Sequence, residues 1–307
     1  MATVLITGGT GLIGRALTKA LLEKGYEVII LTRDPSKFAT HTTRLNYAAW
    51  DLAAQTIDTD AITKADHIIH LAGAGVADQR WSKKRKKEIV ESRVKSGELL
   101  VKALKETANK VQSVISSSAI GWYGPDGKKQ NAAFTEDAPP ASDFLGQTCK
   151  QWEASIEPVT QLGKRLVKLR TGIVLSKDGG ALKEFLKPLR FGIASILGTG
   201  RQMISWIHID DMVRLYITAI EKENMNGVYN AVAPSPVTNK QLIMALARKK
   251  RGRFFIPVYV PSFVLKIMLG EMSIEVLKSA TVSCEKLSKA GFVFQYPTIT
   301  AAFKDIK

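Results

Sequence analysis

Residues 7–14 (TGGTGLIG) constrain the fold of this 307-residue chain more than any other segment. A short apolar run, residues 3–7, precedes the glycines, as expected of a buried parallel strand. Residues 12–24 follow with apolar side chains at helical spacing, and residues 27–32 form a second apolar run. The chain is therefore expected to begin with a β-α-β unit whose first turn is rich in glycine.

The three glycines of this turn, Gly8, Gly11 and Gly14, each meet a different steric demand. Gly8 permits the tight turn, Gly11 lets the backbone approach a pyrophosphate, and Gly14 lets the helix pack close to the strand. The pyrophosphate then lies on unpaired N–H groups at the positive end of the helix. The alternative is a tight turn without a ligand. We predict a dinucleotide site formed by Gly8, Thr10, Gly11, Leu12, Ile13 and Gly14.

The end of the second strand bears on the choice of cofactor. An acidic residue there would bind the ribose 2′-hydroxyl and favour NAD, whereas an arginine accommodates a 2′-phosphate. This chain has Arg33, followed by Asp34, with Lys37 nearby. We predict that Arg33 binds the phosphate and that the cofactor is NADP(H). The alternative is that Asp34 binds the ribose while Arg33 is solvated.

Strand-like and helix-like segments alternate along the first half of the chain. Apolar runs at 65–71, 111–116 and 166–169 alternate with helical patterns at 83–105 and 145–162. This alternation predicts an α/β fold, a Rossmann-type doubly wound parallel sheet.

The pattern loosens after about residue 172, although residues 203–208 are strand-like and residues 210–222 are helical. We expect residues 1–171 plus about 203–232 to form an NADP-binding domain. A smaller, mostly helical substrate or lid domain would comprise about 172–202 plus 233–307.

Composition excludes several classes of protein. Two cysteines, Cys149 and Cys284, make neither a disulfide scaffold nor a zinc cluster, so no metal is expected and a cytoplasmic location is predicted. The first residues lack the pattern of a secretory signal, and no apolar run is long enough to span a bilayer.

The formal charge of +16 would attract polyanions, and basic residues gather at 80–88 and 248–253. No DNA- or RNA-reading motif accompanies this charge, so we expect no nucleic-acid partner. The second basic cluster precedes an apolar stretch, residues 254–269. That combination is either a peripheral membrane anchor or a lid that packs on the sheet domain, and the family resemblance given below supports the lid.

Further motifs resemble the extended short-chain dehydrogenase/reductases. Residues 71–75 (LAGAG) resemble the family segment beneath the adenosine ribose, and residues 206–211 (WIHIDD) resemble a strand–helix junction. The chain is most similar to an atypical epimerase-like subgroup with a C-terminal domain of unknown function. The segments of this chain that carry the similarity to the subgroup are HLAGAG (70–75), RWS (80–82), ESR (91–93), SAIGWYG (118–124), Trp152 with Glu153, GEM (270–272) and GFVFQYP (291–297).

The resemblance implies further cofactor contacts. They lie at the ends of the third, fourth and fifth strands and on one helix: Asp51, Leu52, Leu71, Ala72, Gly73, Ser116 and Lys150.

The resemblance also implies catalysis by a serine, a tyrosine and a lysine four residues after the tyrosine. Ser118 matches the serine and Lys150 is the candidate lysine, but Gly146 stands where the tyrosine is expected. Tyr123 is the substitute proton donor that we consider, but the alternative that Tyr123 and Trp122 only form a wall of the pocket is favoured.

We therefore expect an NADP(H)-dependent oxidoreductase or epimerase-like enzyme. Its substrate would be a small carbonyl or hydroxyl compound, nucleotide-linked compounds included. The missing tyrosine motivates an alternative, a non-catalytic NADP(H)-binding sensor or scaffold. Association into a homodimer is left open.

Overall fold

The protein is described here from a computed structural model, which describes residues 1–38, 43–127 and 132–304. Its centre is an eight-stranded sheet in the order β12-β7-β6-β5-β1-β2-β3-β4. The strands are β1 (Thr3–Thr7), β2 (Glu27–Thr32), β3 (Leu45–Asp51), β4 (Thr56–Ile57), β5 (His67–His70), β6 (Ser113–Ala119), β7 (Arg165–Thr171) and β12 (Gly227–Ala231). All neighbouring pairs are parallel except β3 with β4. The predicted doubly wound α/β fold is confirmed.

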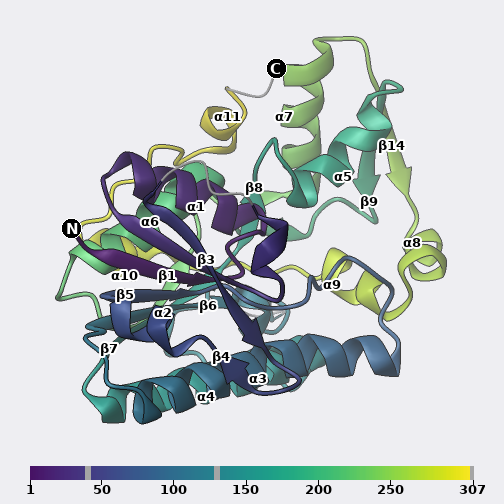
Figure 1. Cartoon of the computed structure of the whole chain (residues 1–307). Coiled ribbons are helices and arrows are strands. Elements are labelled where there is room, and N and C mark those ends of the chain that lie inside the picture. Colours follow the sequence, from purple (N-terminus) through teal and green to yellow (C-terminus); the bar gives the residue numbers. More distant parts are fainter. Residues whose placement is uncertain (39–42, 128–131, 305–307) are drawn as a thin grey trace.

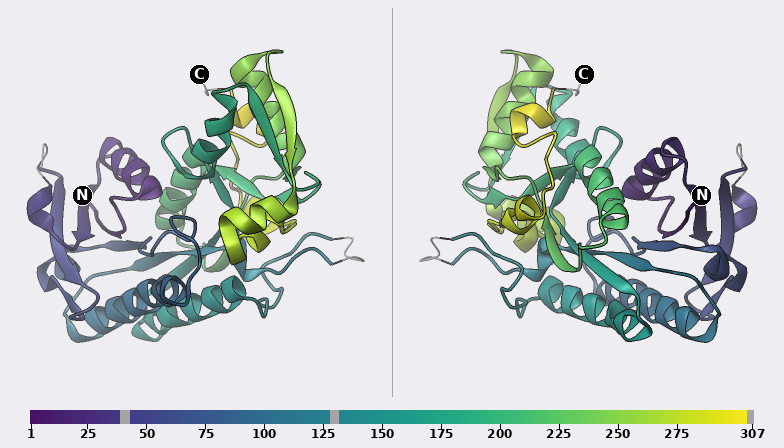
Figure 2. Two further views of the ribbon diagram at one scale, coloured as in Figure 1. Left: turned by 90° about the vertical axis from the view of Figure 1, so that its right-hand side faces the viewer. Right: turned by 90° about the vertical axis from the view of Figure 1, so that its left-hand side faces the viewer.

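Helices cover both faces of this sheet (Figures 1 and 2). One face carries α1 (Leu12–Glu23) and α6 (Ile209–Glu221), and the other carries α2 (Thr59–Lys64), α3 (Lys83–Glu106) and α4 (Phe144–Ile156). Side chains of a strand alternate between the two faces. Within β1, Val4 and Ile6 therefore pack with α1 and α6, whereas Leu5 packs on the α3 side.

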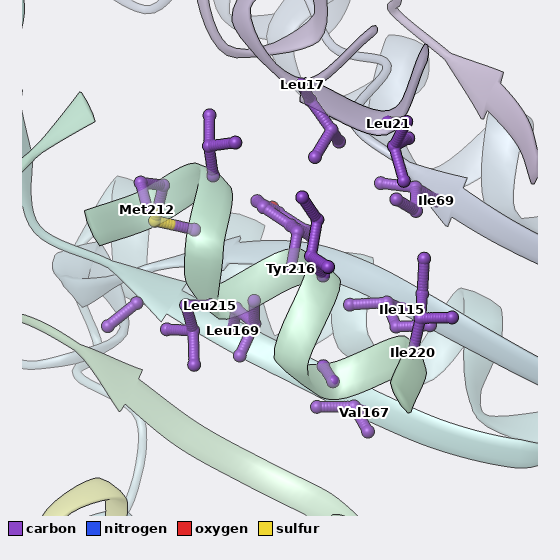
Figure 3. Packing of buried hydrophobic residues seen from close by; sticks show 14 of the residues in the cluster. Leu17, Leu21, Ile69, Ile115, Val167, Leu169, Met212, Leu215, Tyr216 and Ile220 are labelled. Atoms are coloured by element: carbon purple, nitrogen blue, oxygen red, sulfur yellow. The ribbon is translucent and has the colours of Figure 1, made fainter. Parts of the chain in front are cut away.

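The core between α1, α6 and the sheet is closely filled (Figure 3). Leu17 and Leu21 of α1 face Met212, Tyr216 and other residues of α6 in one buried cluster. Ile69, Ile115 and Val167 rise into this cluster from three neighbouring strands. This packing fixes the start of α1, and with it the glycine turn, against the carboxyl ends of the strands.

A second body of short elements stands above the carboxyl edge of the sheet. Its strands form three separate pairs: β8 (Ile173–Leu175) with β11 (Trp206–His208), β10 (Met203–Ile204) with β13 (Val237–Thr238), and β9 (Ile193–Leu197) with β14 (Ile256–Val260). Its helices are α5 (Gly180–Leu189), α7 (Asn239–Arg251), α8 (Ser262–Leu269), α9 (Ser273–Leu277) and α11 (Ile299–Ala302). α10 (Glu285–Lys289) instead packs beside β12, and its Leu287 joins the core cluster of α1 and α6.

Three details differ from the sequence-based expectations. The helix expected over 145–162 ends at Ile156 and continues as a 3-10 turn, because Pro158 cannot continue an α-helix. The strand expected over 203–208 is two short strands with different partners, separated at Ser205. The stretch 254–269, expected to pack as a lid, leaves most of its large apolar side chains in solvent.

Candidate functional site

The glycine turn has the backbone geometry that only glycine accepts easily. Gly8 has φ +69°, in the left-handed region, and its carbonyl accepts a 3.0 Å hydrogen bond from the Gly11 N–H. A Cβ on Gly14 would lie 2.5 Å from the Gly9 Cα. The helix start is thereby held against the turn.

The first turn of α1 fits an anionic group. Gly11 is its N-cap residue, no side chain caps it, and its first turn holds no acidic residue. Uncapped N–H groups at a helix start attract phosphate, so the residues present fit the pyrophosphate of a dinucleotide. Thr10 and Gly11 are exposed beside this helix end, Leu12 and Ile13 are half-buried, and Gly14 is buried.

The loop after β5 is locked to the glycine turn. A Cβ on Gly8 would lie 3.0 Å from the Leu71 carbonyl carbon, so the two backbones are in contact. The Thr7 hydroxyl accepts hydrogen bonds from the Leu71 and Ala72 N–H groups, at 3.1 and 3.2 Å. Gly73 follows as an exposed residue. The turn and this loop therefore behave as one unit.

A buried histidine completes that unit. The Thr7 hydroxyl lies 2.8 Å from His70 Nδ1 and His70 Nε2 lies 3.3 Å from the Ser96 hydroxyl. Because Thr7 already accepts two N–H groups, its own hydrogen points to Nδ1, and the ring carries its proton on Nε2. Burial, helped by the nearby Arg93, lowers the His70 pKa to about 3. The imidazole is therefore neutral and links β1, β5 and α3.

The end of β2 presents Arg33 to solvent. Asp34 is engaged locally: its carboxylate caps a 3-10 turn by accepting from the Ser36 N–H and hydroxyl, and it pairs with Lys37 at 3.2 Å. These contacts lower the Asp34 pKa, the Ser36 hydroxyl most of all. None of the hydrogen bonds and ion pairs within the described parts of the chain involves the Arg33 side chain. Arg33, and not Asp34, is thus available to a ligand at this strand end.

The strand ends named by the sequence converge on one edge of the sheet. The carboxyl ends of β1, β2, β3 and β5 are neighbours in a parallel array. At the end of β3, Leu52 is half-buried and the exposed Asp51 carboxylate accepts from the Ala53 and Ala54 N–H groups. Ser116 lies within β6, buried, and its hydroxyl donates to the Ser117 carbonyl.

Ser118 faces a buried ion pair. Its hydroxyl donates a 2.7 Å hydrogen bond to Glu153 Oε1 of α4. Arg170 of β7 donates from Nε to the same oxygen and from a terminal nitrogen to Oε2, at 2.8 and 3.1 Å. All three side chains are buried. The serine is therefore occupied inside the protein, which differs from the expected role at a substrate carbonyl.

Tyr123 belongs to the same network. It is fully buried, its hydroxyl donates to Asn230 Oδ1 at 2.7 Å, and it accepts from Arg170 at 3.0 Å. Burial raises the pKa of this phenol, although Arg170 opposes the shift. This placement argues against Tyr123 as the substitute proton donor, because a ligand could reach its hydroxyl only if the hydrogen bonds to Asn230 and Arg170 were broken.

The first turns of α4 place two side chains, Leu145 and Cys149, against the turn that follows β6. A Cβ on Gly121 would lie 3.2 Å from the Leu145 Cβ and 3.6 Å from the Cys149 sulfur. Leu145 and Cys149 are four residues apart and share one face of the helix. The positions where the resemblance places a tyrosine and a lysine, Gly146 and Lys150, each lie one residue further along α4. Burial raises the Cys149 pKa to about 12. Lys150 is the next residue and is exposed, so the structure does not bring it to this face.

The segment after the β5 loop meets the C-terminal part of the chain beside α4. Trp81 packs edge-on against Phe144 with ring centroids 5.0 Å apart. A Cβ on Gly270 would lie 3.2 Å from the Arg80 guanidinium, and Lys86 pairs with Glu271. Arg80, Trp81 and Phe144 therefore gather where α3 and α4 begin.

Sequence analysis missed the buried groups that organise the site: Thr7, His70, Ser96, Arg170 and Asn230. One signal was present, since Arg170 is a charged residue in an otherwise apolar strand and requires a buried partner. In the described ranges, no cluster of three or more His, Cys, Asp or Glu side chains could hold a metal ion. Nor is any helix there both long and apolar enough to cross a bilayer.

Comparisons with known proteins agree with this geometry. The model of the NAD-dependent epimerase/dehydratase family matches residues 4–145, and that of a domain of unknown function, DUF1731, matches residues 260–306. An epimerase family protein of Staphylococcus saprophyticus is 35% identical over 306 residues, covering 100% of this chain and 99% of the relative. Epimerase family protein SDR39U1 of Mus musculus is 33% identical, with 99% of each chain covered.

A solved structure extends these matches. Human epimerase family protein SDR39U1, crystallised with NADPH, superposes with a TM-score of 0.85 at 31% identity, covering 99% of this chain and 98% of that one. The chain therefore belongs to the NAD-dependent epimerase/dehydratase family and ends, in its last fifty residues, in the DUF1731 domain.

Proposed function

We propose that this protein binds NADP(H) in preference to NAD(H) across the carboxyl edge of its sheet. The observation that carries the proposal is the difference in contacts between two neighbouring side chains at the end of β2. Asp34 is tied to Ser36 and Lys37, whereas the Arg33 guanidinium is exposed and without a partner in the described structure. An arginine there forms charge-assisted hydrogen bonds to a 2′-phosphate. The similar human protein was crystallised with NADPH, which supports the same preference.

The glycine turn would hold the pyrophosphate on the N–H groups at the start of α1. Residues 71–73 and Leu52 would flank the adenosine, since they follow the neighbouring strands. Thr7 and His70 would act as positioning residues, because they lock the turn to the loop after β5. Lys150 and Ser116 have no part in this proposal, since one is exposed on α4 and the other is buried within a strand.

We propose further that the protein is an oxidoreductase or epimerase-like enzyme acting on a small carbonyl or hydroxyl compound. The bound nicotinamide would supply or accept hydride. Arg80, Trp81 and Phe144 would form the mouth through which the substrate enters. Because Ser118 and Tyr123 are occupied in the interior, the proton would come from water or from the substrate itself.

One observation favours a second candidate function, a non-catalytic NADP(H)-binding sensor or scaffold. Gly146 stands where the catalytic tyrosine is expected, and the hydroxyls of Ser118 and Tyr123 are engaged inside the protein. Cofactor binding would persist without turnover. The homodimer left open by the sequence has no part in this proposal.

The first experiment is a titration of the purified protein with NADPH and, separately, with NADH, followed by quenching of tryptophan fluorescence. We expect NADPH to bind at least about tenfold more tightly, the effect of one charge-assisted contact. Equal affinities would refute the preference, and absence of binding by either cofactor would refute the dinucleotide site.

The two candidate functions are separated by turnover. A panel of aldehydes, ketones and nucleotide-linked sugars is incubated with protein and NADPH, and absorbance at the nicotinamide band is followed. Substrate-dependent loss of absorbance supports the enzyme. An epimerase returns the hydride and leaves this absorbance unchanged, so the sugars are also incubated with protein and NADP⁺ and their configuration is analysed. If NADPH binds but no compound is reduced and no sugar changes configuration, the sensor is supported, and its partners should then bind differently in the presence of NADPH and NADP⁺.

A further inference from the structure

In the parallel pair of β9 and β14, β9 is covered on one side, whereas β14 is exposed over most of its length. Ala194 and Ile196 of β9 are buried against the α5 and α7 side. The alternate residue Ile193 points the other way, and it is paired with Ile256 of β14. Ile256 is 69% exposed, and Val258, two residues further on the same side, is 41% exposed. The outer side of this pair is therefore an apolar surface that no element of the described chain covers.

An arginine–phenylalanine pair precedes each of these two strands. Arg190 and Phe191 lie at the end of α5 just before β9, and Arg253 and Phe254 lie just before β14. The backbones are close here, since a Cβ on Gly192 would lie 3.7 Å from the Phe254 carbonyl oxygen. Phe191 and Phe254 are 84% and 87% exposed. Two aromatic rings thus project from one end of the pair, each next to an arginine.

The open surface continues at the other end of β14. Only Pro261 separates this strand from α8, and the two elements follow one another along one edge of the molecule (Figure 1). Phe263, Lys266 and Ile267 lie on one side of α8 by their spacing, and all three are exposed, as is Met268. Exposed apolar side chains thus extend from the phenylalanine tip to α8.

All charges in these segments are basic. Residues 185–197 and 248–269 contain no Asp or Glu, and their charged residues are Lys187, Arg190, Arg248, Lys249, Lys250, Arg251, Arg253 and Lys266. The Arg251 side chain donates to the Leu189 and Arg190 carbonyls, which fixes its charge at the end of α5. We call this surface, formed by residues 190–193, 253–258 and 263–268, the basic–apolar face.

We propose that the basic–apolar face docks on the surface of an anionic lipid bilayer. Exposed aromatic and aliphatic side chains can enter the interfacial region, while neighbouring arginines and lysines bind acidic headgroups. No helix needs to cross the bilayer for this contact. A soluble polyanion would use the charges and leave the apolar side chains without a partner. A second copy of the chain would bring two basic rims together, and like charges repel.

Co-sedimentation of the full chain with vesicles tests the proposal. Vesicles of phosphatidylcholine alone are compared with vesicles that contain about one third phosphatidylserine. We expect sedimentation with the anionic vesicles only, and loss of binding as the salt concentration rises from about 0.1 M to about 0.5 M. The double variant R190Q/R253Q should bind about thirtyfold more weakly, because each cation at an anionic surface contributes about fivefold.

The apolar contribution is tested by F191S/F254S, in which two highly exposed side chains are replaced at little risk to folding. We expect binding at least about tenfold weaker than that of the parent, since insertion of apolar area adds to the electrostatic attraction. Val293→Ser is the matched control, because Val293 is 73% exposed outside this face. K19Q/K87Q, on α1 and α3, is the charge control. Both controls should bind as the parent does.

Three results would overturn the proposal. The first is absence of sedimentation with anionic vesicles at low salt. The second is vesicle binding by F191S/F254S with the same affinity as the parent, which would mean that electrostatic attraction alone accounts for the binding. The third is a dimer in light scattering that F191S/F254S converts to a monomer, which would assign the face to a second copy of the chain.

Discussion

Glu153 and Arg170 form a buried, two-pronged ion pair that joins α4 to β7. Both members of the pair make further hydrogen bonds. Ser118 donates to the carboxylate, and Arg170 also donates to the Tyr123 hydroxyl and to the Glu136 carbonyl. The Arg170 guanidinium lies 3.6 Å from the centre of the Trp122 ring. A buried charge pair is tolerated when its remaining hydrogen-bonding capacity is satisfied in this way. The polar side chains at the end of β6 therefore stabilise the fold.

The first prediction concerns Tyr123→Phe. Removal of the hydroxyl leaves Asn230 Oδ1 without its donor and deprives Arg170 of an acceptor, so unfolding should become easier by about 1–3 kcal/mol. NADPH affinity and any turnover should stay unchanged. Urea unfolding and the fluorescence titration measure the two effects.

Tyr259→Phe is the control for this experiment, since Tyr259 is half exposed on β14 and its loss should leave stability unchanged. If Tyr123→Phe instead abolishes turnover while stability is retained, the proton-donor hypothesis for Tyr123 is restored.

The second prediction concerns Arg33→Ala. NADPH affinity should fall about ten- to a hundredfold, because a charge-assisted contact to the 2′-phosphate is lost, and NADH affinity should not change. The comparison of both cofactors on both proteins by fluorescence titration checks this. Lys37→Ala, which removes a cation that is paired with Asp34, serves as control and should alter neither affinity much. Equal weakening of NADPH and NADH would contradict the role given to Arg33.

The sheet and the glycine turn were predictable because their signals are local. The apolar run before Gly8, the helical spacing after it and the second apolar run lie within the first thirty-two residues. The positions of Ser118 and Tyr123 were not predictable, because their partners Glu153 and Asn230 come from elements far away in the chain. A motif predicts the strand end at which a residue lies, but packing between distant segments decides which atoms its side chain contacts.

The pairing of β9 with β14 was unpredictable for the same reason. The two strands are short and are separated by four strands and two helices, so neither segment predicts its partner. Without that pairing, the apolar stretch 254–269 favoured a packed lid. In the structure, residues 256–260 of this stretch form one strand of a two-stranded pair, and most of the large apolar side chains of the stretch remain exposed to solvent.

The third prediction concerns Gly14→Ala. The added methyl group would lie 2.5 Å from the Gly9 Cα and would also meet the Gly8 carbonyl, so the backbone of the turn must shift. We expect a loss of stability of about 1–3 kcal/mol, the usual result of overpacking, together with loss of NADPH binding. Thermal unfolding and the fluorescence titration measure both. Gly124→Ala is the matched control, since its Cβ would meet only the Ala141 Cβ at 3.6 Å, and it should be tolerated.

The fourth prediction concerns His70 and acid. Its pKa is about 3 in the native state and about 6.5 in an unfolded chain. Between these values the unfolded state binds a proton that the native state rejects, so the stability due to neutral His70 is complete above pH 6.5 and falls as the pH drops. From pH 7.5 to pH 5 this one group should remove about 2 kcal/mol from the free energy of unfolding.

His70→Asn tests that sign. The variant loses hydrogen bonds to Thr7 and Ser96, so it should be less stable than the parent at pH 7.5. Its further loss of stability between pH 7.5 and pH 5 should be smaller than that of the parent by about 2 kcal/mol, because no imidazole remains to be protonated. Urea unfolding of both proteins at the two pH values gives the comparison. A parallel decline of the two proteins would show that the native pKa of His70 is close to that of an unfolded chain, which would contradict a ring kept neutral by burial.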